Sequence, residues 1–354
     1  MREKERELSV KILVILTGGT IGSLISENVI NVKEGASAKL IEMYQEKEGN
    51  DIEFEVIQPL NILSENLDPS YWEVLCDCLD QVELNQYQGI IITHGSDTLS
   101  YTAAMIGLCY SHTSIPIVLI ASNYALQDER SNGFANFYYA VCFIKEEQRA
   151  GVFAVYQNNK EENIVYLATR LKEADTYLDQ FSSFGSVDFG KIAENGFWEI
   201  IHEQNPARQE MQVHTEKWRQ EKFRYIKKVL LIHSYPGLDY NSILLDSGIG
   251  AVLFATYHSA TVCGGTKQCP VEKFLKKCKG KGIEVYACSF KPVEDFYATS
   301  TELLRQGVIP LVNISTEAAY AKLILAYNQP IKDRKTFMNK NIYFEILPEL
   351  IMKK

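Results

Sequence analysis

Residues 10–22 read Val10-Lys-Ile-Leu-Val-Ile-Leu-Thr-Gly-Gly-Thr-Ile-Gly22 and decide the fold of the first half of the chain. The segment 10–16 is an almost continuous apolar run, which is typical of a strand buried on both faces of a parallel sheet. It ends on the turn 17–22, where two adjacent glycines let the backbone turn sharply. Because open α/β sheets bind ligands beyond the carboxyl ends of their strands, this turn is a candidate binding site.

The rest of the first half repeats this alternation of apolar runs and helical periodicity. Further strands are expected at 53–59, 89–93, 115–121 and 151–156, and helices at 71–82, 98–110 and 133–143. Such alternation predicts parallel strands joined by right-handed crossovers, and Asn158 and Asn159 predict that the last strand returns as a hairpin. The expected fold is α/β, with a larger N-terminal, doubly wound, mostly parallel sheet domain plus a smaller C-terminal α/β domain.

The domain organisation follows from length and composition. The chain has 354 residues, more than the ~250–300 at which one hydrophobic core usually stops growing. We expect an N-terminal domain over 1–190 that carries both motifs, a linker over 191–226 and a C-terminal domain over 227–354. The last of these should hold strands at 228–233, 250–255 and 283–288 and helices at 271–279 and 317–327.

Charge and composition exclude several classes of partner. The formal net charge is −9, from 45 acidic and 36 basic residues, which argues against a nucleic-acid partner. Two short basic clusters, Lys276 to Lys281 and Lys332 to Lys335, are interpreted as solvated helix or loop surface and not as a phosphate-binding patch. No apolar stretch approaches the ~20 residues of a membrane span, and residues 1–16 lack the features of a signal peptide, so a cytoplasmic protein is expected.

The eight cysteines show no metal-ligand spacing. The C-x-C pair Cys76 and Cys78 has no histidine or second pair to complete a zinc site, so no metal is expected. Cys109, Cys142 and Cys288 lie in apolar surroundings and are expected to be reduced, buried thiols.

A second polar turn follows the expected strand 89–93 and reads His94-Gly-Ser-Asp-Thr98. It places the Ser96 hydroxyl and the Asp97 carboxylate at the start of a helix, where helix capping is the simpler alternative. For the first turn the simpler alternative is a tight connection, and a nucleotide site is disfavoured because the spacing is G-G-x-x-G. His94 is expected to be structural, because adjacent side chains of an extended segment point in opposite directions and prevent a Ser-His-Asp triad.

The two turns together resemble the paired signature of the bacterial-type L-asparaginases, whose second motif usually reads H-G-T-D-T, and Ser96 marks this chain as a divergent member. The likeness continues at Leu63-Ser-Glu-Asn66, in the place of a substrate-binding serine segment, and at Arg130-Ser-Asn-Gly133 with Asn136. It is fainter at Tyr297-Ala-Thr-Ser300 and at Glu317-Ala318.

The resemblance implies a site and a reaction. Thr20 matches the nucleophile that attacks a side-chain amide, and Ser96 matches a second hydroxyl that polarises the carbonyl or positions water. Asp97 matches the carboxylate that pairs with the substrate ammonium group, and Ser64 matches the hydroxyl that holds the substrate carboxylate; Gly19 and Glu65 complete the expected substrate site. The resemblance also implies a homodimer or homotetramer that needs no cofactor.

Three departures from the family pattern bear on activity. Ser96 keeps the hydroxyl of the usual threonine, but Ile30 stands where the family has a loop tyrosine. The family's lysine falls without gaps on Leu171, between Arg170 and Lys172. A desolvated lysine amine can have its pKa lowered and then accept a proton, which arginine cannot do, so we expect Lys172 to take this catalytic place through a one-residue irregularity. The alternative is that the lysine is lost and Lys172 is a surface charge.

The expected function is therefore an amidohydrolase that converts L-asparagine or a related amide to the acid and ammonia. The alternative is a catalytically impaired amino-acid-binding or regulatory protein that keeps the fold. A dinucleotide-binding dehydrogenase is a third and weaker alternative.

Overall fold

The computed structural model describes residues 10–19, 21, 23–26, 29–32, 36–147, 149–159, 162–212, 217–291 and 297–349. Only the backbone is described for residue 212 and for the described residues between 23 and 38. The chain divides into two compact units, Met1–Lys217 and Trp218–Lys354. Each contains its own sheet and is described by itself.

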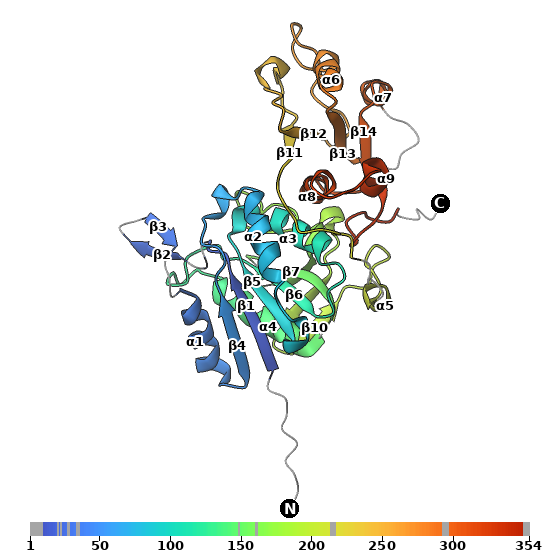
Figure 1. Ribbon diagram of the computed structural model, residues 1–354. Helices are drawn as coiled ribbons and strands as arrows, with labels where there is room; N and C mark the ends of the chain where they lie inside the picture. The colour runs from blue at the N-terminus through green and yellow to red at the C-terminus, as the bar shows by residue number, and fades with distance from the viewer. Residues whose placement is uncertain are drawn as a thin grey trace, which may run out of the picture. The chain divides into compact units, whose positions relative to one another are not determined.

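The first unit is built on an eight-stranded sheet of order β10-β9-β8-β7-β6-β5-β1-β4. The five strands at one end run parallel and are β4 (Ile52–Ile57), β1 (Val10–Leu16), β5 (Gly89–Thr93), β6 (Pro116–Ile120) and β7 (Gly151–Gln157). Every residue of β5 and β6 is buried, as expected for strands covered on both faces. The predicted doubly wound, mostly parallel sheet is confirmed (Figure 1).

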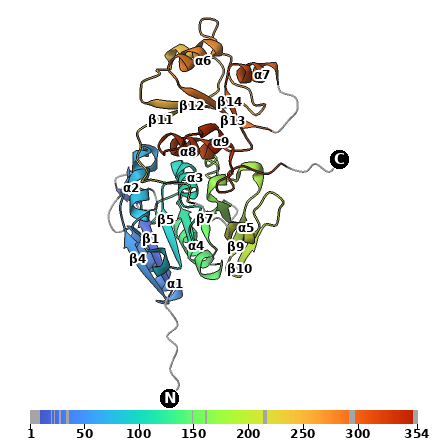
Figure 2. The same cartoon turned by 45° about the vertical axis from the view of Figure 1, so that its right-hand side comes forward.

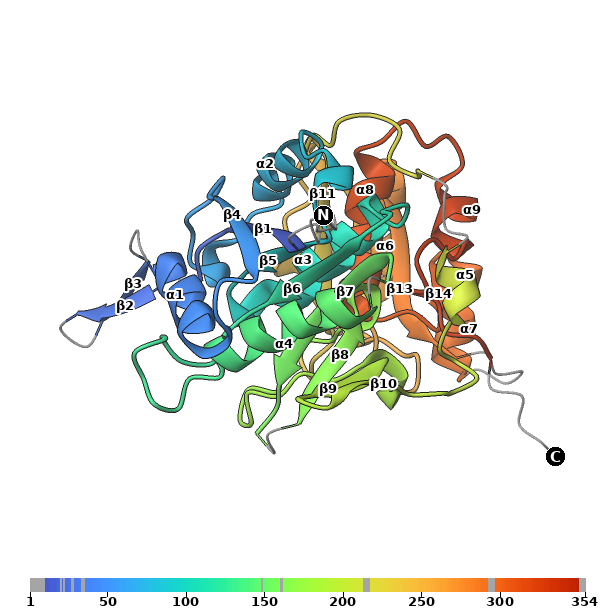
Figure 3. The same ribbon diagram turned by 90° about the horizontal axis from the view of Figure 1, so that it is seen from below.

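Four helices join these parallel strands: α1 (Ala36–Glu48), α2 (Ser70–Leu79), α3 (Leu99–Cys109) and α4 (Gly133–Glu147). Figure 3 shows α1 and α4 on the near face of the sheet and α2 and α3 behind it. Contacts agree, because the rings of Tyr44 in α1 and Phe137 in α4 lie 6.4 Å apart. On the other face, Trp72 of α2 donates from Nε1 to Thr102 of α3 at 3.0 Å.

One crossover departs from the expected hand. The connections through α2, α3 and α4 all step in one direction along the sheet, but α4 lies on the face opposite to α2 and α3. The β6–α4–β7 connection therefore has the opposite hand to the other three, and the expectation of right-handed crossovers throughout is wrong. The reason is packing, because α3 already covers β6 and β7 on its own face.

The far end of the first sheet is antiparallel. The expected hairpin is present, since β7 pairs with β8 (Asn163–Leu167), and β9 (Gly190–Ala193) and β10 (Gly196–Glu199) extend the sheet. Residues 191–199, which we expected to open the linker 191–226, thus belong to the first sheet. The apolar faces of Phe189 and Phe197, which stack at 6.0 Å, explain why this polar-looking stretch folds onto the unit. Among the described residues, the short helix α5 (Arg208–Gln212) follows before the boundary between the units.

The second unit holds a parallel sheet of order β11-β12-β13-β14. Its strands are β11 (Lys228–His233), β12 (Ile249–Ala255), β13 (Glu284–Phe290) and β14 (Ile309–Val312). Figure 2 shows α6 (Val271–Gly280) and α7 (Ala298–Arg305) on one side of this sheet and α8 (Thr316–Tyr327) and α9 (Arg334–Asn339) on the other. The core is mostly aliphatic and includes an aromatic group, in which Tyr240 stacks on Phe274 at 5.0 Å beside Phe254.

Two further expectations concern the whole chain. All eight cysteines are free thiols, and Cys109 and Cys288 are buried as expected, whereas Cys142 is half-buried because α4 presents it near the surface. Across the described residues, no helix has both the length and the apolar character of a membrane-spanning segment.

Candidate active site

The two polar turns lie side by side because β1 and β5 are neighbours in the sheet. Leu16 pairs with Thr93 in the parallel register, so the chain leaves both strands at the same edge. From this edge β1 leads to α1 on one face and β5 leads to α3 on the other. The two strand ends therefore flank the point where the chain direction reverses, which is where open α/β sheets place their ligands.

The first turn is held by its own backbone and by the segment after β4. The Thr17 hydroxyl donates to the Thr93 carbonyl at 2.8 Å, which ties the first strand end to the second. Gly19 N–H donates to the Ile62 carbonyl at 2.8 Å, and Ile62 N–H donates back to Thr17 at 3.0 Å. Gly18 and Gly19 have φ of 100° and 76°, a region that favours glycine. The pair is thus required by the turn.

Close backbone approach brings three segments together. A Cβ on Gly19 would lie 2.4 Å from the Gly95 nitrogen, and a Cβ on Gly95 would lie 2.4 Å from the Ser64 Oγ. Neither contact is possible between real atoms, so any side chain at these positions would push the segments apart. The glycines of the two motifs therefore serve to bring the first turn, the second turn and Ser64 into one place.

Ser64 and Asp97, expected to bind opposite ends of an amino acid, are joined directly. The Ser64 Oγ donates to Asp97 Oδ2 at 2.7 Å. Ser64 lies in the short turn Ser64–Asn66 and is 4% exposed, whereas Asp97 is exposed to solvent. Glu65, the other expected residue of this turn, is exposed. A buried donor thus orients a carboxylate that solvent can reach.

Thr98 strengthens this arrangement and was not assigned a role from the sequence. Its Oγ1 donates to the Ser64 carbonyl at 3.0 Å, so the turn Ser96–Thr98 and the turn Ser64–Asn66 are linked by two hydrogen bonds. The signal was present, because Thr98 closes the second motif. The contact could not be predicted because Thr98 and Ser64 are 34 residues apart in the sequence.

The helix-capping alternative for the second turn finds no support. Thr98 occupies the N-cap position of α3, yet no side-chain capping hydrogen bond forms there, nor at Gly95 before the turn Ser96–Thr98. The Ser96 hydroxyl is half-exposed and makes no hydrogen bond within the described part of the chain. Ser96 therefore lies at the helix start without capping it, and its hydroxyl is available to a ligand.

His94 is a structural residue. It is 2% exposed, its backbone N–H donates to Ile120 at 2.8 Å, and its ring Nδ1 lies 2.8 Å from the Gly95 carbonyl. Burial lowers the pKa of the imidazole below its ordinary value, so the neutral form with the proton on Nδ1 is favoured. No hydrogen bond joins His94 to Ser96 in the described structure, in keeping with the expectation that no triad forms here.

The segment expected to supply the lysine follows β8. A single turn at Ala168–Arg170 interrupts the strand, Leu171 is 1% exposed and forms an isolated bridge with Ser183, and Lys172 is exposed. Arg170 is 2% exposed and donates to the Gln204 carbonyl at 2.7 Å. Within the described residues no hydrogen bond or ion pair joins Lys172 to Ser96, so its role as base stays a prediction.

Two expected features fall outside the described atoms. Thr20, the expected nucleophile, lies outside the described residues, although both its neighbours are described. For Ile30 only the backbone is described; it pairs with Ile25 in the hairpin of β2 (Ser23–Ser26) and β3 (Val29–Val32).

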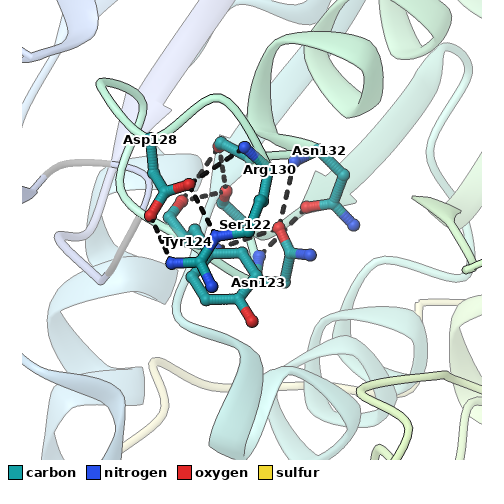
Figure 4. A network of polar contacts seen from close by, with 7 residues as sticks. Ser122, Asn123, Tyr124, Asp128, Arg130 and Asn132 are labelled. Carbon is teal, nitrogen blue, oxygen red and sulfur yellow. Dashed lines mark hydrogen bonds and ion pairs between the residues drawn. The ribbon is translucent and has the colours of Figure 1, made fainter.

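A polar network orders the loop after β6, at the same edge of the sheet (Figure 4). Asn123 and Asn132 exchange two hydrogen bonds of 3.0 Å, each backbone N–H donating to the other side chain. Arg130 binds Asp128 through two nitrogens and lies over the Tyr124 ring at 4.1 Å, and its hydrogen bonds lower the pKa of Asp128 to about 2. The motif Arg130 to Gly133 is thus a rigid loop next to the candidate site.

The arrangement suits recognition of a small amino acid. It offers a carboxylate, a buried hydroxyl and a half-exposed hydroxyl beside a helix start, within a framework of close glycine contacts. Among the described residues no cluster of histidine, cysteine or acidic side chains could hold a metal ion.

Comparison with known proteins agrees with this geometry. The family model described as "Asparaginase, N-terminal" matches residues 11–206, which is more than half of the chain. That span contains both polar turns, Ser64, Lys172 and the loop of Figure 4.

Curated relatives cover almost the whole chain. A glutamyl-tRNA(Gln) amidotransferase subunit of Pyrococcus furiosus is 26% identical over 360 residues, which cover 98% of this chain and 78% of the relative. The corresponding protein from Methanococcus maripaludis is 27% identical over 360 residues, covering 97% and 82%.

Solved structures share the fold. The thermostable L-asparaginase from Thermococcus kodakarensis superposes with a TM-score of 0.75 at 20% identity, covering 96% of this chain and all of the other. L-asparaginase I from Vibrio cholerae gives a TM-score of 0.73 at 22% identity, covering 95% and 99%.

Proposed function

Because the chain belongs to the asparaginase family, we propose that it hydrolyses the side-chain amide of L-asparagine or a related amide to the acid and ammonia. The observation that carries this proposal is the Ser64–Asp97 hydrogen bond at the reversal point of the sheet. A carboxylate and a hydroxyl at this place can recognise the two charged groups that every α-amino acid carries. Charge-assisted contacts of this kind are roughly twice as strong as neutral ones.

In the proposed reaction the Thr20 hydroxyl attacks the amide carbon and forms a tetrahedral intermediate. The C–N bond then breaks, ammonia leaves with the proton of the hydroxyl, and an acyl ester remains on Thr20. Water next attacks the ester carbon, releases the acid and restores the hydroxyl. This acyl transfer needs no metal or organic cofactor, because a hydroxyl nucleophile, a base and N–H donors supply its chemistry.

Within this reaction Asp97 pairs with the substrate ammonium group, and the Ser64 hydroxyl turns its one proton from Asp97 to the substrate carboxylate when the substrate binds. Ser96 polarises the scissile carbonyl or positions the water, and Lys172 accepts and returns the proton. Gly19 brings its backbone next to Gly95 at the reacting end, and Glu65 lies beside Ser64 at the substrate carboxylate end. We further propose that the protein is a homodimer or homotetramer and that it is cytoplasmic. The eight free thiols support the cytoplasmic location, because thiols stay reduced there.

A second candidate function rests on one observation. Lys172 is exposed and Leu171 is buried at the place of the family's lysine, so hydroxyl activation would lack a base if Lys172 stays in solvent. The chain would then be a binding or regulatory protein that recognises an amino acid with the same Ser64 and Asp97 but does not turn it over.

Ammonia release separates the two candidates. Purified full-length protein is incubated with L-asparagine, L-glutamine and D-asparagine, and ammonia is measured; glutamine is included because the named relatives comprise amidotransferase subunits as well as L-asparaginases. Release from at least one amide supports the enzyme. Binding of L-aspartate by calorimetry without ammonia release from any of the three overturns it and favours the binding protein.

A further inference from the structure

A hollow lies at the amino-terminal edge of the second sheet, in a part of the molecule that the proposed reaction does not use. It has a volume of about 520 Å³, within the range of small-molecule sites. Residues before β11, β12 and β13 line it together with the end of α8 and the start of α9; they are Lys227, Asp246, Ser247, Ile249, Gly250, Lys281, Gly282, Ile283, Tyr327 and Arg334.

Both basic clusters of the sequence contribute to this hollow. Lys281 belongs to the first cluster and Arg334 to the second, and the fold brings them together although they are far apart in the chain. Lys281 is exposed, in keeping with the interpretation of its cluster as solvated surface, whereas Arg334 is half-buried. Lys281 comes to this edge just before β13, and Arg334 comes to it at the start of α9.

Arg334 is prepared for an anion. Its Nε–H donates to the Ala326 carbonyl at 3.2 Å, and its guanidinium carbon lies 4.6 Å from the centre of the Tyr327 ring. These contacts fix the plane of the guanidinium, while its two terminal amino groups make no hydrogen bond or ion pair with the described part of the chain. A fixed guanidinium with free terminal N–H groups is suited to bidentate binding of phosphate oxygens.

Two lysines are placed by backbone carbonyls of one loop. The Lys281 Nζ donates to the Leu245 carbonyl at 2.9 Å, and the Lys227 Nζ lies 3.4 Å from the Ser247 carbonyl. A carbonyl orients an ammonium group without neutralising it, and each ammonium keeps further protons for a ligand. Neither lysine has a carboxylate partner among the described residues.

The acidic residues nearby do not cancel this charge. Asp246 is the one carboxylate in the described lining, and it accepts from Gly248 N–H at 2.7 Å and faces Lys228 at 3.6 Å. Lys228 does not line the hollow, so it offsets Asp246 from outside. Glu284 accepts a hydrogen bond from the Tyr327 hydroxyl and is likewise absent from the lining. Three cations therefore face the hollow against one carboxylate that is already paired.

We propose that this hollow is a binding site for a small molecule carrying a diphosphate or longer phosphate chain. A single phosphate would leave most of the volume empty, and the three cations that line the hollow come from three separate segments, which favours a ligand with more than one phosphate. The site lies in the second unit alone, so it is independent of the amidohydrolase proposal.

Calorimetric titration of the full-length protein with pyrophosphate at low ionic strength tests the site. We expect saturable binding of one pyrophosphate per chain, weakened at least tenfold by Arg334→Gln and, separately, by Lys281→Gln. Lys335→Gln is the matched control, because Lys335 follows Arg334 in α9 but does not line the hollow. The affinity of this variant for pyrophosphate should stay within twofold of that of the wild-type protein.

The contradicting outcomes are distinct. Absence of saturable binding to the wild-type protein overturns the proposal, and so does an equal loss of affinity in Lys335→Gln, which would mark general surface charge. Citrate titrated in the same way separates phosphate recognition from general polyanion binding, and equal affinity for citrate overturns the phosphate assignment. If Arg334→Gln does not fold, Lys281→Gln still decides, because Lys281 lies in a surface turn.

Discussion

The Ser64 hydroxyl donates to the Asp97 carboxylate at 2.7 Å, so two segments separated by more than thirty residues hold each other before any ligand arrives. Ser64 is buried and Asp97 is exposed, which fixes the direction of the carboxylate while leaving its other oxygen to solvent. In the proposed complex the substrate ammonium group binds Asp97, and the Ser64 hydroxyl turns its one proton to the substrate carboxylate. The free protein therefore already holds both side chains of the proposed site next to each other.

Asp97→Asn should weaken substrate binding and leave the fold intact. The amide oxygen can still accept from Ser64, but the negative charge that pairs with the ammonium group is lost, at a cost of roughly 1.5–3 kcal/mol. We expect KM to rise by about tenfold to a hundredfold. Asp51→Asn is the control, because Asp51 pairs with Lys145 just before β4, at the opposite edge of the sheet. Unchanged KM in Asp97→Asn would refute the role of this carboxylate.

Thr98→Val should raise KM with little change in kcat. The substitution keeps the shape but removes the donor to the Ser64 carbonyl, a hydrogen bond worth about 1 kcal/mol, so KM should increase about fivefold. Thr98→Ser should restore it. Thr301→Val, which removes a comparable hydroxyl contact in α7, should change neither parameter. A fall in kcat at constant KM would show that Thr98 does not act through Ser64.

Lys172→Met should reduce kcat by about 10²–10⁴-fold while sparing the affinity for L-aspartate, since a general base contributes about that factor. Steady-state kinetics and calorimetry measure the two effects separately. Lys191→Met is the control, because Lys191 is also exposed and pairs with Glu162 on the antiparallel part of the sheet. If kcat is unchanged in Lys172→Met, another group is the base.

Buried His94 should make the protein less stable in mild acid. Its pKa is lowered in the folded state, whereas in the unfolded chain it has the ordinary value of 6.5. Below pH 6.5 the unfolded state therefore binds more protons, and the free energy of unfolding falls as the pH falls, with a limiting slope of about 1.4 kcal/mol per pH unit.

Urea unfolding between about pH 5 and about pH 7 measures this slope. His94→Asn lacks the titrating ring and should show a shallower dependence on pH, even if its stability at neutral pH is lower. An equal slope in the variant and the wild-type protein would mean that His94 is not the group responsible.

Much of the fold could be predicted because several of its strands are continuous apolar runs in the sequence. Val10–Leu16, Gly89–Thr93 and Lys228–His233 have the predicted bounds, since each is an apolar run that ends on a turn residue. The hand of the β6–α4–β7 connection could not be predicted, because it depends on which face α3 already covers. The strands β9 and β10 were missed because their glycines and charged residues resemble a linker until Phe189 and Phe197 pack.

The candidate site was predictable where glycines force segments together and less so elsewhere. Gly19 and Gly95 indicate from the sequence that the backbone is approached closely at these positions. In the structure their backbones are in direct contact. The position of Lys172 depends on a single turn at Ala168–Arg170 that no local pattern predicts. The Thr98–Ser64 contact depends on the distance between two turns, which only the folded sheet sets.

Comparison of Thr20→Ala with Thr20→Ser decides whether the Thr20 hydroxyl is the nucleophile. Ammonia release from the preferred amide and calorimetric binding of L-aspartate are measured for both variants and the wild-type protein. The account predicts that Thr20→Ala abolishes ammonia release while aspartate still binds, and that Thr20→Ser keeps measurable turnover because it keeps a hydroxyl nucleophile. Wild-type turnover by Thr20→Ala would contradict it.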